Sequence, residues 1–299
     1  MGYFLAALFG GLLLFNSQAT PERAARGMES ALRRQYPGRQ IDVEVKGKRG
    51  LNVVRGKFKS VTLMMSGGTA TGANLFPIAA VAKAKKAGRI GRIAVQLRDF
   101  DLDGLRVESA DLNWSDVVYD WGTLRKTSQM NFVSAGPATA RVLIPASSLQ
   151  TLLLQRVKDI QNPKMSLQNG RILVSGTRPA PIFGTPLPFT LSARPEVRNQ
   201  TEIWLADVQA TMSGSPLPSA LVSGLTEKFN PVYKFSFSDK WPFSMNITRL
   251  NAQNDKLEVL ADLTFIPAVT TPQTAPQTLP RTAPTPLPSS APARVLQPS

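Results

Sequence analysis

The side chains of this sequence best suited to chemistry are carboxylates, because the chain contains no histidine and no cysteine. Without histidine, the commonest general base, metal ligand and partner of a nucleophile are all missing. Asp111, Asp116 and Asp120 lie close together in the sequence, and glycoside hydrolysis uses a pair of carboxylates. Acidic residues at such spacing are more typical of solvated turns. We therefore expect a binding protein with no catalytic residues, not an enzyme.

Two other motifs resemble ligand sites but lack essential residues. The run of alternating aspartates from 99 to 104 would need a bidentate acid at the twelfth position of a calcium loop, where Ala110 stands. A strand face that closes with an Asp-Gly turn explains these aspartates better. The segment GGTATGAN (67–74) lacks the Lys-Ser/Thr ending of a phosphate loop, and we interpret it as a flexible loop. No metal ion and no cofactor are expected.

The formal net charge of the chain is +15, from 35 Lys and Arg against 20 Asp and Glu. Such an excess favours a polyanionic partner, which is either nucleic acid or an anionic membrane surface. The N-terminus favours the membrane. Residues 3–15 form an apolar run of thirteen, which is short for a membrane span and typical of a signal peptide.

Small residues follow this run at Ser17 and Ala19, so cleavage after Ala19 is the favoured interpretation. No Lys or Arg precedes the run, which leaves an uncleaved anchor or a buried N-terminal helix as alternatives. Either an export signal or an anchor places the rest of the chain outside the cytoplasm and argues against nucleic acid. Residues 267–299 are rich in Pro, Thr and Ser and contain no acidic residue, which predicts a disordered tail. The predicted organisation is therefore an export segment (1–19), a folded domain (20–266) and a tail (267–299).

The folded domain should contain more strands than helices. Hydrophobic residues alternate with polar ones at 41–45, 61–65 and 93–97, those at 100–107 flank an Asp-Gly turn, and further strands are expected at 138–144, 170–176, 187–193, 202–212, 232–237, 243–250 and 256–266. This period of two predicts half-buried antiparallel strands. Helices are expected from Thr20-Pro21 to about residue 36, from 145 to about 160, and from 216 to about 229. The expected fold is α+β, with one long twisted antiparallel sheet curved around a few amphipathic helices.

Two of these helices carry apolar stripes that would suit an acyl chain. The stripes either line an apolar trough for lipid or fill an ordinary core. The candidate lipid-binding residues are Leu149, Leu152, Leu153, Val157, Leu217, Leu221 and Leu225.

A basic stretch and an aromatic group are candidates for membrane contact. The stretch either lies against anionic headgroups or forms a solvated loop or helix face. Its members are Lys83, Lys85, Lys86, Arg89 and Arg92. Trp114, Tyr119 and Trp121 fit a membrane interface and ordinary sheet packing equally well.

The segment VLIPASSLQTLLLQRVKDIQNPKMSLQNGRILVSG (142–176) resembles the LmeA-like phospholipid-binding family of bacterial envelope proteins. Residues 41–67, 208–225 and 256–265 look like other parts of the same family, so the resemblance covers roughly 22–266. It implies a fold similar to tubular lipid-binding domains, and binding of phospholipid or a related glycolipid at the cell surface or in the periplasm. It carries over no individual binding residue, because the family has no sharp motif.

We therefore expect an extracytoplasmic, membrane-associated protein that binds or transfers phospholipid or glycolipid. The alternative is a structural protein of the cell envelope that binds wall polymers through its basic surface and tail.

Overall fold

The computed structural model describes residues 20–35, 38–70, 78–127, 130–154, 160–179, 186–236 and 241–268. All of these belong to one compact unit, residues 1–268, and a second unit comprises residues 269–299. The predicted export segment and the predicted tail from residue 269 onward lie outside the described residues, so both stay predictions.

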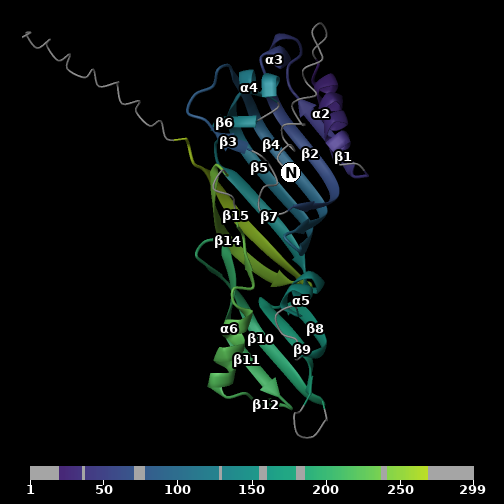
Figure 1. The fold of residues 1–299 in the computed structure, drawn as a ribbon, viewed down its shortest axis with the longest axis vertical. Coiled ribbons are helices and arrows are strands. Elements are labelled where there is room, and N and C mark those ends of the chain that lie inside the picture. The colour runs from purple at the N-terminus through teal and green to yellow at the C-terminus, as the bar shows by residue number, and fades with distance from the viewer. Residues whose placement is uncertain are drawn as a thin grey trace, which may run out of the picture. The chain divides into compact units, whose positions relative to one another are not determined.

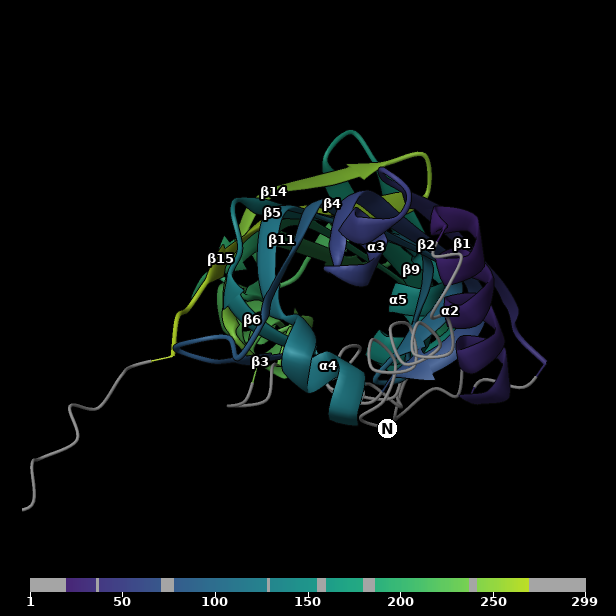
Figure 2. The same ribbon diagram turned by 90° about the horizontal axis from the view of Figure 1, so that it is seen from above.

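A nine-stranded sheet forms the larger part of the first unit and curls as it crosses from edge to edge (Figures 1 and 2). Its main order is β1-β2-β4-β5-β7-β15-β14, and β6 joins β3 to β5. The strands are β1 (Gln40–Lys46), β2 (Lys57–Ala70), β3 (Ile78–Ala80), β4 (Ala87–Leu102), β5 (Leu105–Asp120), β6 (Met130–Ser134), β7 (Ala138–Pro145), β14 (Phe243–Gln253) and β15 (Lys256–Phe265). In β1 the alternation of polar and apolar residues becomes an alternation of exposed and buried ones, as predicted.

The prediction of purely antiparallel pairing was wrong at two places. β2 pairs with β4 in parallel, with Leu63 opposite Val95, and β3 pairs with β6 in parallel. A long connection separates β2 from β4, so β4 can return to the sheet in the same direction as β2. The first part of the predicted flexible loop, residues 67–70, continues β2, and residues 71–74 lie outside the described part of the chain.

A second sheet of six strands has the order β12-β11-β10-β9-β8, with β13 beside β11. Its strands are β8 (Gln161–Gln168), β9 (Arg171–Pro179), β10 (Pro186–Arg198), β11 (Glu202–Met212), β12 (Ser215–Pro216) and β13 (Tyr233–Lys234). Backbone hydrogen bonds join it to the β14–β15 hairpin, from Gly170 N to Ala252 O (3.0 Å) and from Asp255 N to Leu167 O (3.1 Å). A second link between the two sheets comes from β13, where Tyr233 Oη donates to Leu102 O (3.2 Å) at the last residue of β4.

The helices are few and mostly short. They are α2 (Pro21–Gln35), α3 (Leu51–Val54), α4 (Trp121–Thr127), α5 (Ala146–Leu154) and α6 (Ser219–Phe229). The predicted start of α2 is confirmed, because Arg23 N donates to the Thr20 side chain at the N-cap (3.3 Å). Within the described residues, no helix is both long and apolar enough to cross a membrane. The α+β class is thus confirmed, with strands outweighing helices.

The second and third predicted helices differ from the structure at their ends. Asn162 and Pro163, predicted to end a helix, lie in β8 instead, because this segment pairs with β9. α6 begins three residues later than predicted, because Ser215 and Pro216 pair with β11 as the short strand β12. α3 and α4 have no counterpart among the predicted helices.

The core settles the two interpretations of the aromatic group in favour of sheet packing. Trp114, Tyr119 and Trp121 are all buried, at 2%, 0% and 3% exposure. Trp114 packs against Phe243 with ring centroids 6.1 Å apart, and Tyr119 meets Trp121 edge to face at 6.2 Å. These aromatic side chains therefore stabilise the inside of the curled sheet and are not available to a membrane interface.

Candidate functional site

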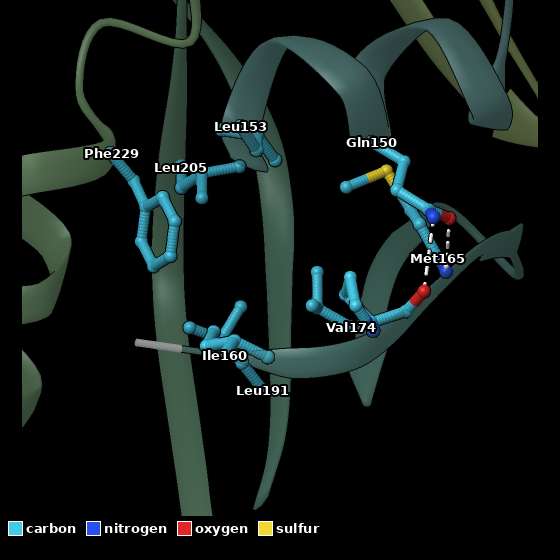
Figure 3. A pocket seen from close by; sticks show the side chains of 9 residues that line it. Gln150, Leu153, Ile160, Met165, Val174, Leu191, Leu205 and Phe229 are labelled. Carbon is cyan, nitrogen blue, oxygen red and sulfur yellow. Dashed lines mark hydrogen bonds between the residues drawn. The ribbon is translucent and has the colours of Figure 1, made fainter. Parts of the chain in front are cut away.

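An apolar pocket lies between the six-stranded sheet, α5 and the end of α6 (Figure 3). Four strands and two helix ends contribute to its wall. The lining residues are Gln150, Leu153, Ile160, Pro163, Met165, Val174, Leu191, Leu205 and Phe229. We call it the Phe229 pocket.

The floor of the Phe229 pocket is a row of side chains across neighbouring strands. Met165 pairs with Val174, and Val174 pairs with Leu191, so the three side chains share one face of the sheet. Val174 and Leu191 are 9% and 2% exposed. On β9 and β10 this face belongs to the strands predicted at 170–176 and 187–193, whereas β8 was not among the strands predicted from the residue pattern.

Gln150 is the one pocket residue with a polar side chain, and its amide is already bonded. Its Nε2 donates to Pro163 O (2.9 Å) and its Oε1 accepts from Met165 N (3.1 Å), as Figure 3 shows. These bonds satisfy backbone groups on β8, which is an edge strand of its sheet. They also fix α5 to the pocket wall and leave the pocket itself without a free polar group.

Phe229, the last residue of α6, lines the side of the pocket across from Gln150. The next residue, Asn230, forms two hydrogen bonds to the backbone of Leu205, accepting from its N (2.7 Å) and donating to its O (3.1 Å). A side-chain amide thus takes the place of a neighbouring strand beside β11. Phe229, 3% exposed, is held directly before this anchor.

The pocket is small and narrow. The centre of a water molecule can reach only about 20 Å³ of it. Ligand pockets commonly span roughly 300 to 1,000 Å³. The space therefore suits a slender apolar group, and a longer one would have to displace the wall.

Of the six predicted lipid-binding residues that the structure describes, Leu153 alone lines this pocket. Leu149 is completely buried in the core and Leu152 is partly buried against it. Leu217 and Leu225 also pack partly against the core, whereas Val157 lies outside the described residues.

Leu221 contradicts the predicted stripe on α6, because its side chain is 58% exposed. α6 reaches the pocket with its last residue and not along one face. The strand residues of the wall were missed in the sequence analysis. Alternation marked them as inward-facing, but only the pairing of distant strands makes them neighbours.

The five predicted headgroup contacts lie at the other end of the nine-stranded sheet. Lys83, Lys85 and Lys86 are exposed in the loop before β4, and Arg89 and Arg92 are exposed on β4 itself. Arg89 forms an ion pair with Asp116 (3.1 Å), and Arg92 donates to Asn113 (2.9 Å). The structure therefore does not bring these cations to the Phe229 pocket.

The candidate carboxylates are spread along β5 and are individually engaged. Asp111 pairs with Arg98 (2.8 Å) and Asp116 with Arg89. They are five residues apart in one strand, roughly 16 Å, whereas the carboxyl groups of glycosidases are about 5 to 9.5 Å apart.

Asp120 is buried at the end of the same strand. Burial by itself would raise the pKa of Asp120, but its hydrogen bonds outweigh burial and lower this pKa. They come from the Thr123 side chain (2.6 Å), Thr123 N and Lys86 N. Asp120 is thus a structural cap that ties the Lys83–Lys86 loop to α4.

Asp99 and Asp101 lie on β4 and Asp103 lies in the turn that follows, which confirms a strand face closed by an Asp-Gly turn. Asp101 accepts from Gly104 N (2.8 Å) in the β4–β5 hairpin, where Gly104 has a φ of 82°. Among the described residues, no cluster of three or more acidic side chains could hold a metal ion.

Comparison with known proteins identifies the family. No curated protein matches the sequence. The LmeA-like phospholipid-binding family matches residues 87–262, from β4 to β15. This stretch contains the whole six-stranded sheet and every residue of the Phe229 pocket. Since the match covers more than half of the chain, the protein belongs to the LmeA-like phospholipid-binding family.

Proposed function

We propose that this protein binds a phospholipid or related glycolipid by taking an acyl chain into the Phe229 pocket, and that it carries the lipid at the cell envelope. One observation carries the proposal beyond family membership. None of the nine lining residues is titratable, and both amide atoms of the one polar side chain, Gln150, are bonded to the backbone. Such a wall offers nothing to a polar substrate, whereas hydrocarbon gains free energy by leaving water.

The proposed location rests on the N-terminal sequence. The apolar run 3–15 and the small residues Ser17 and Ala19 are typical of an export signal. A protein outside the cytoplasm, with a charge of +15, would meet anionic lipid surfaces. The family is a lipid-binding one and supports binding without catalysis.

The narrowness of the pocket implies that the wall moves when lipid enters. Leu153 and Phe229 lie on helices, which side-chain hydrogen bonds of Gln150 and Asn230 hold to the sheet in place of strand pairing. Val174 and Leu191, in contrast, are paired within the sheet. We propose that the two helix ends move apart while the strands stay in place.

The test is to fill the pocket and measure bound lipid. The full-length chain would be purified gently. Native mass spectrometry of the intact complex would then count the phospholipid molecules bound to each protein. Val174→Phe adds a ring at the floor of the pocket and should lower the lipid per protein to a small fraction of the wild-type value. Thermal unfolding would verify that the variant is folded.

Val208→Phe is the matched control, since it makes the same change in the same sheet. Val208 packs partly against the core but does not line the pocket. It should retain its lipid. A wild-type protein without any lipid, or a folded Val174→Phe protein with as much lipid as the control, would contradict the proposal.

A further inference from the structure

The end of the nine-stranded sheet that carries α3 exposes apolar side chains. α3 is a single turn between β1 and β2, and Leu51 and Val54 on it are 69% and 42% exposed. Leu51 has the highest exposure of any large hydrophobic residue among those the structure describes. Val53, between them, is buried at 2% and holds the turn to the core. We call residues 46–59 the α3 tip.

Two neighbouring segments at this end of the sheet are rich in cations. Residues 46–59 and 83–92 together contain eleven Lys and Arg and no Asp or Glu. The two segments are neighbours, since Lys57 pairs with Arg89 and Arg89 N donates to Gly56 O (2.9 Å).

Three of the eleven cations form ion pairs, with Glu44, Glu22 and Asp116. The other eight form none with any residue that the structure describes. These eight exposed residues are Lys48, Arg55, Lys57, Lys59, Lys83, Lys85, Lys86 and Arg92.

The backbone of the tip is held from inside, so the outward position of Leu51 and Val54 is built into the fold. Trp121 Nε1 donates to Val54 O (2.9 Å), and Tyr119 Oη donates to Gly56 O (3.0 Å). Gly56 has a φ of 68°, and a Cβ there would meet Tyr119 Oη at 2.7 Å. A preorganised apolar surface loses little conformational entropy when it binds.

The N-terminal segment of the chain joins the fold at this same end. Glu22, at the start of α2, forms an ion pair with Arg49 of the tip (3.7 Å). Residue 15, the last of the apolar run, precedes Glu22 by seven residues, which span about 25 Å at most. A membrane-bound N-terminus would therefore hold the α3 tip close to the same membrane.

We propose that the α3 tip docks on an anionic phospholipid bilayer. Leu51 and Val54 enter the boundary between headgroups and acyl chains, and the surrounding cations bind the phosphates. Apolar residues within a basic surface are what interfacial binding requires. The proposal does not rest on the Phe229 pocket. β4 alone places roughly 43 Å between Arg89, at the tip, and Leu102, next to the six-stranded sheet.

Single cysteines provide the test, because the natural chain has none. Leu51→Cys and Leu221→Cys, in the full-length chain, would each carry an environment-sensitive fluorophore. Both leucines are well exposed, but Leu221 lies on α6, beside the six-stranded sheet. The vesicles would contain phosphatidylglycerol and phosphatidylcholine, with a quencher attached to the acyl chains.

The label at position 51 should be quenched and blue-shifted, whereas the label at 221 should be unaffected. The apolar N-terminal run joins the fold close to the tip and is present in both proteins, so variants that remove charge from the tip and leave this run intact test the tip itself. Adding Lys48→Ser and Lys57→Ser to the 51-labelled protein should weaken vesicle binding by on the order of fivefold per charge removed.

Three outcomes would overturn the proposal. Equal quenching at 51 and 221 would show that the tip does not face the bilayer. Equal quenching at 51 with vesicles of phosphatidylcholine alone would remove the role of anionic lipid. Binding without quenching at 51 would mean that charge alone recruits the chain, as it would to any polyanion. None of these results depends on whether lipid occupies the Phe229 pocket.

Discussion

The α3 tip and the Phe229 pocket use apolar side chains in opposite ways. At the tip, Leu51 and Val54 point outward among cations, on a turn whose carbonyl groups are held from inside by Trp121 and Tyr119. In the pocket, Val174 and its neighbours point inward, and the polar groups of the wall are bonded to each other.

The comparison shows that hydrogen bonds to the backbone determine whether an apolar side chain faces solvent or lines a pocket. Both regions depend on side chains that satisfy distant backbone groups, namely Trp121 and Tyr119 at the tip, and Gln150 and Asn230 at the pocket. At the tip, bonds from core residues hold the backbone so that Leu51 and Val54 face outward. At the pocket, bonds from Gln150 and Asn230 to strand edges hold α5 and α6 over the apolar face of the sheet. A mutation of an anchoring residue should therefore destabilise its own region and leave the other region unchanged.

The largest effect is expected at Trp121. Trp121→Ala removes a ring that is 3% exposed and the hydrogen bond to Val54 O, so it should lower the free energy of unfolding by about 3 to 5 kcal/mol. Urea unfolding would measure this loss, and trypsin should cut faster at the basic residues of the loosened tip. Trp121→Phe keeps an aromatic ring and should lose only about 1 kcal/mol through the missing N–H. If both variants were as stable as the wild type, neither the bond nor the packing would anchor the tip.

A pair of glycines tests how closely the tip is packed. Gly50 and Gly56 have φ values of 70° and 68°, but only at Gly56 would a Cβ collide, with Tyr119 and Trp121. Both alanine variants bear the cost of a positive φ, and only Gly56→Ala adds the collision. Gly56→Ala should be about 1 to 3 kcal/mol less stable than Gly50→Ala in thermal unfolding. Equal losses would mean that the aromatic pair moves freely away from the turn.

At the pocket, Gln150 is the corresponding anchor. Gln150→Leu leaves Pro163 O and Met165 N without their side-chain partner, and should reduce stability by about 1 to 2 kcal/mol. Hydrogen exchange should show reduced protection of the Met165 amide, with no change at the α3 tip. Gln209→Leu, at an exposed position of β11, is the control and should leave both unchanged. A protected Met165 amide in Gln150→Leu would contradict the anchoring role.

The smallest effect concerns Glu202, a buried acid of the six-stranded sheet. Hydrogen bonds from Trp204 Nε1 (2.9 Å) and the Asn199 amide (2.9 Å), together with Lys234 (3.2 Å), lower the pKa of Glu202. A folded-state pKa below the unfolded value, about 4.3, gives stability that is fully present above that pH. This stability is lost as the pH falls through the folded-state pKa.

Glu202→Gln should therefore lose less stability than the wild type when the pH is lowered below about 4.3. Trp204→Phe removes the hydrogen bond that contributes most to lowering the pKa of Glu202, and should shift the pH dependence in the same direction. Urea unfolding at a series of acidic pH values measures both. Identical pH profiles for all three proteins would rule out Glu202 as a source of acid sensitivity, and neither variant should alter the α3 tip.

Much of the local structure could be predicted from the sequence. The Thr20-Pro21 start of α2, the alternation in β1 and the bounds of β11 agree with the structure. The resemblance to the LmeA-like family was also confirmed over β4 to β15. These features depend on residues that are close in the chain, because caps and the two-residue period act over a few positions.

The tertiary structure alone decided how these elements combine. It paired β2 with β4 in parallel, placed Asn162 and Pro163 in β8, and left Leu221 exposed on a helix that meets the pocket only through Phe229. It also turned Leu51 and Val54 outward, by means of bonds from residues more than sixty positions away. Local patterns determine whether a side chain faces a core. Which distant side chains share that face, and which carbonyl groups they hold, depends on long-range pairing that no local pattern encodes.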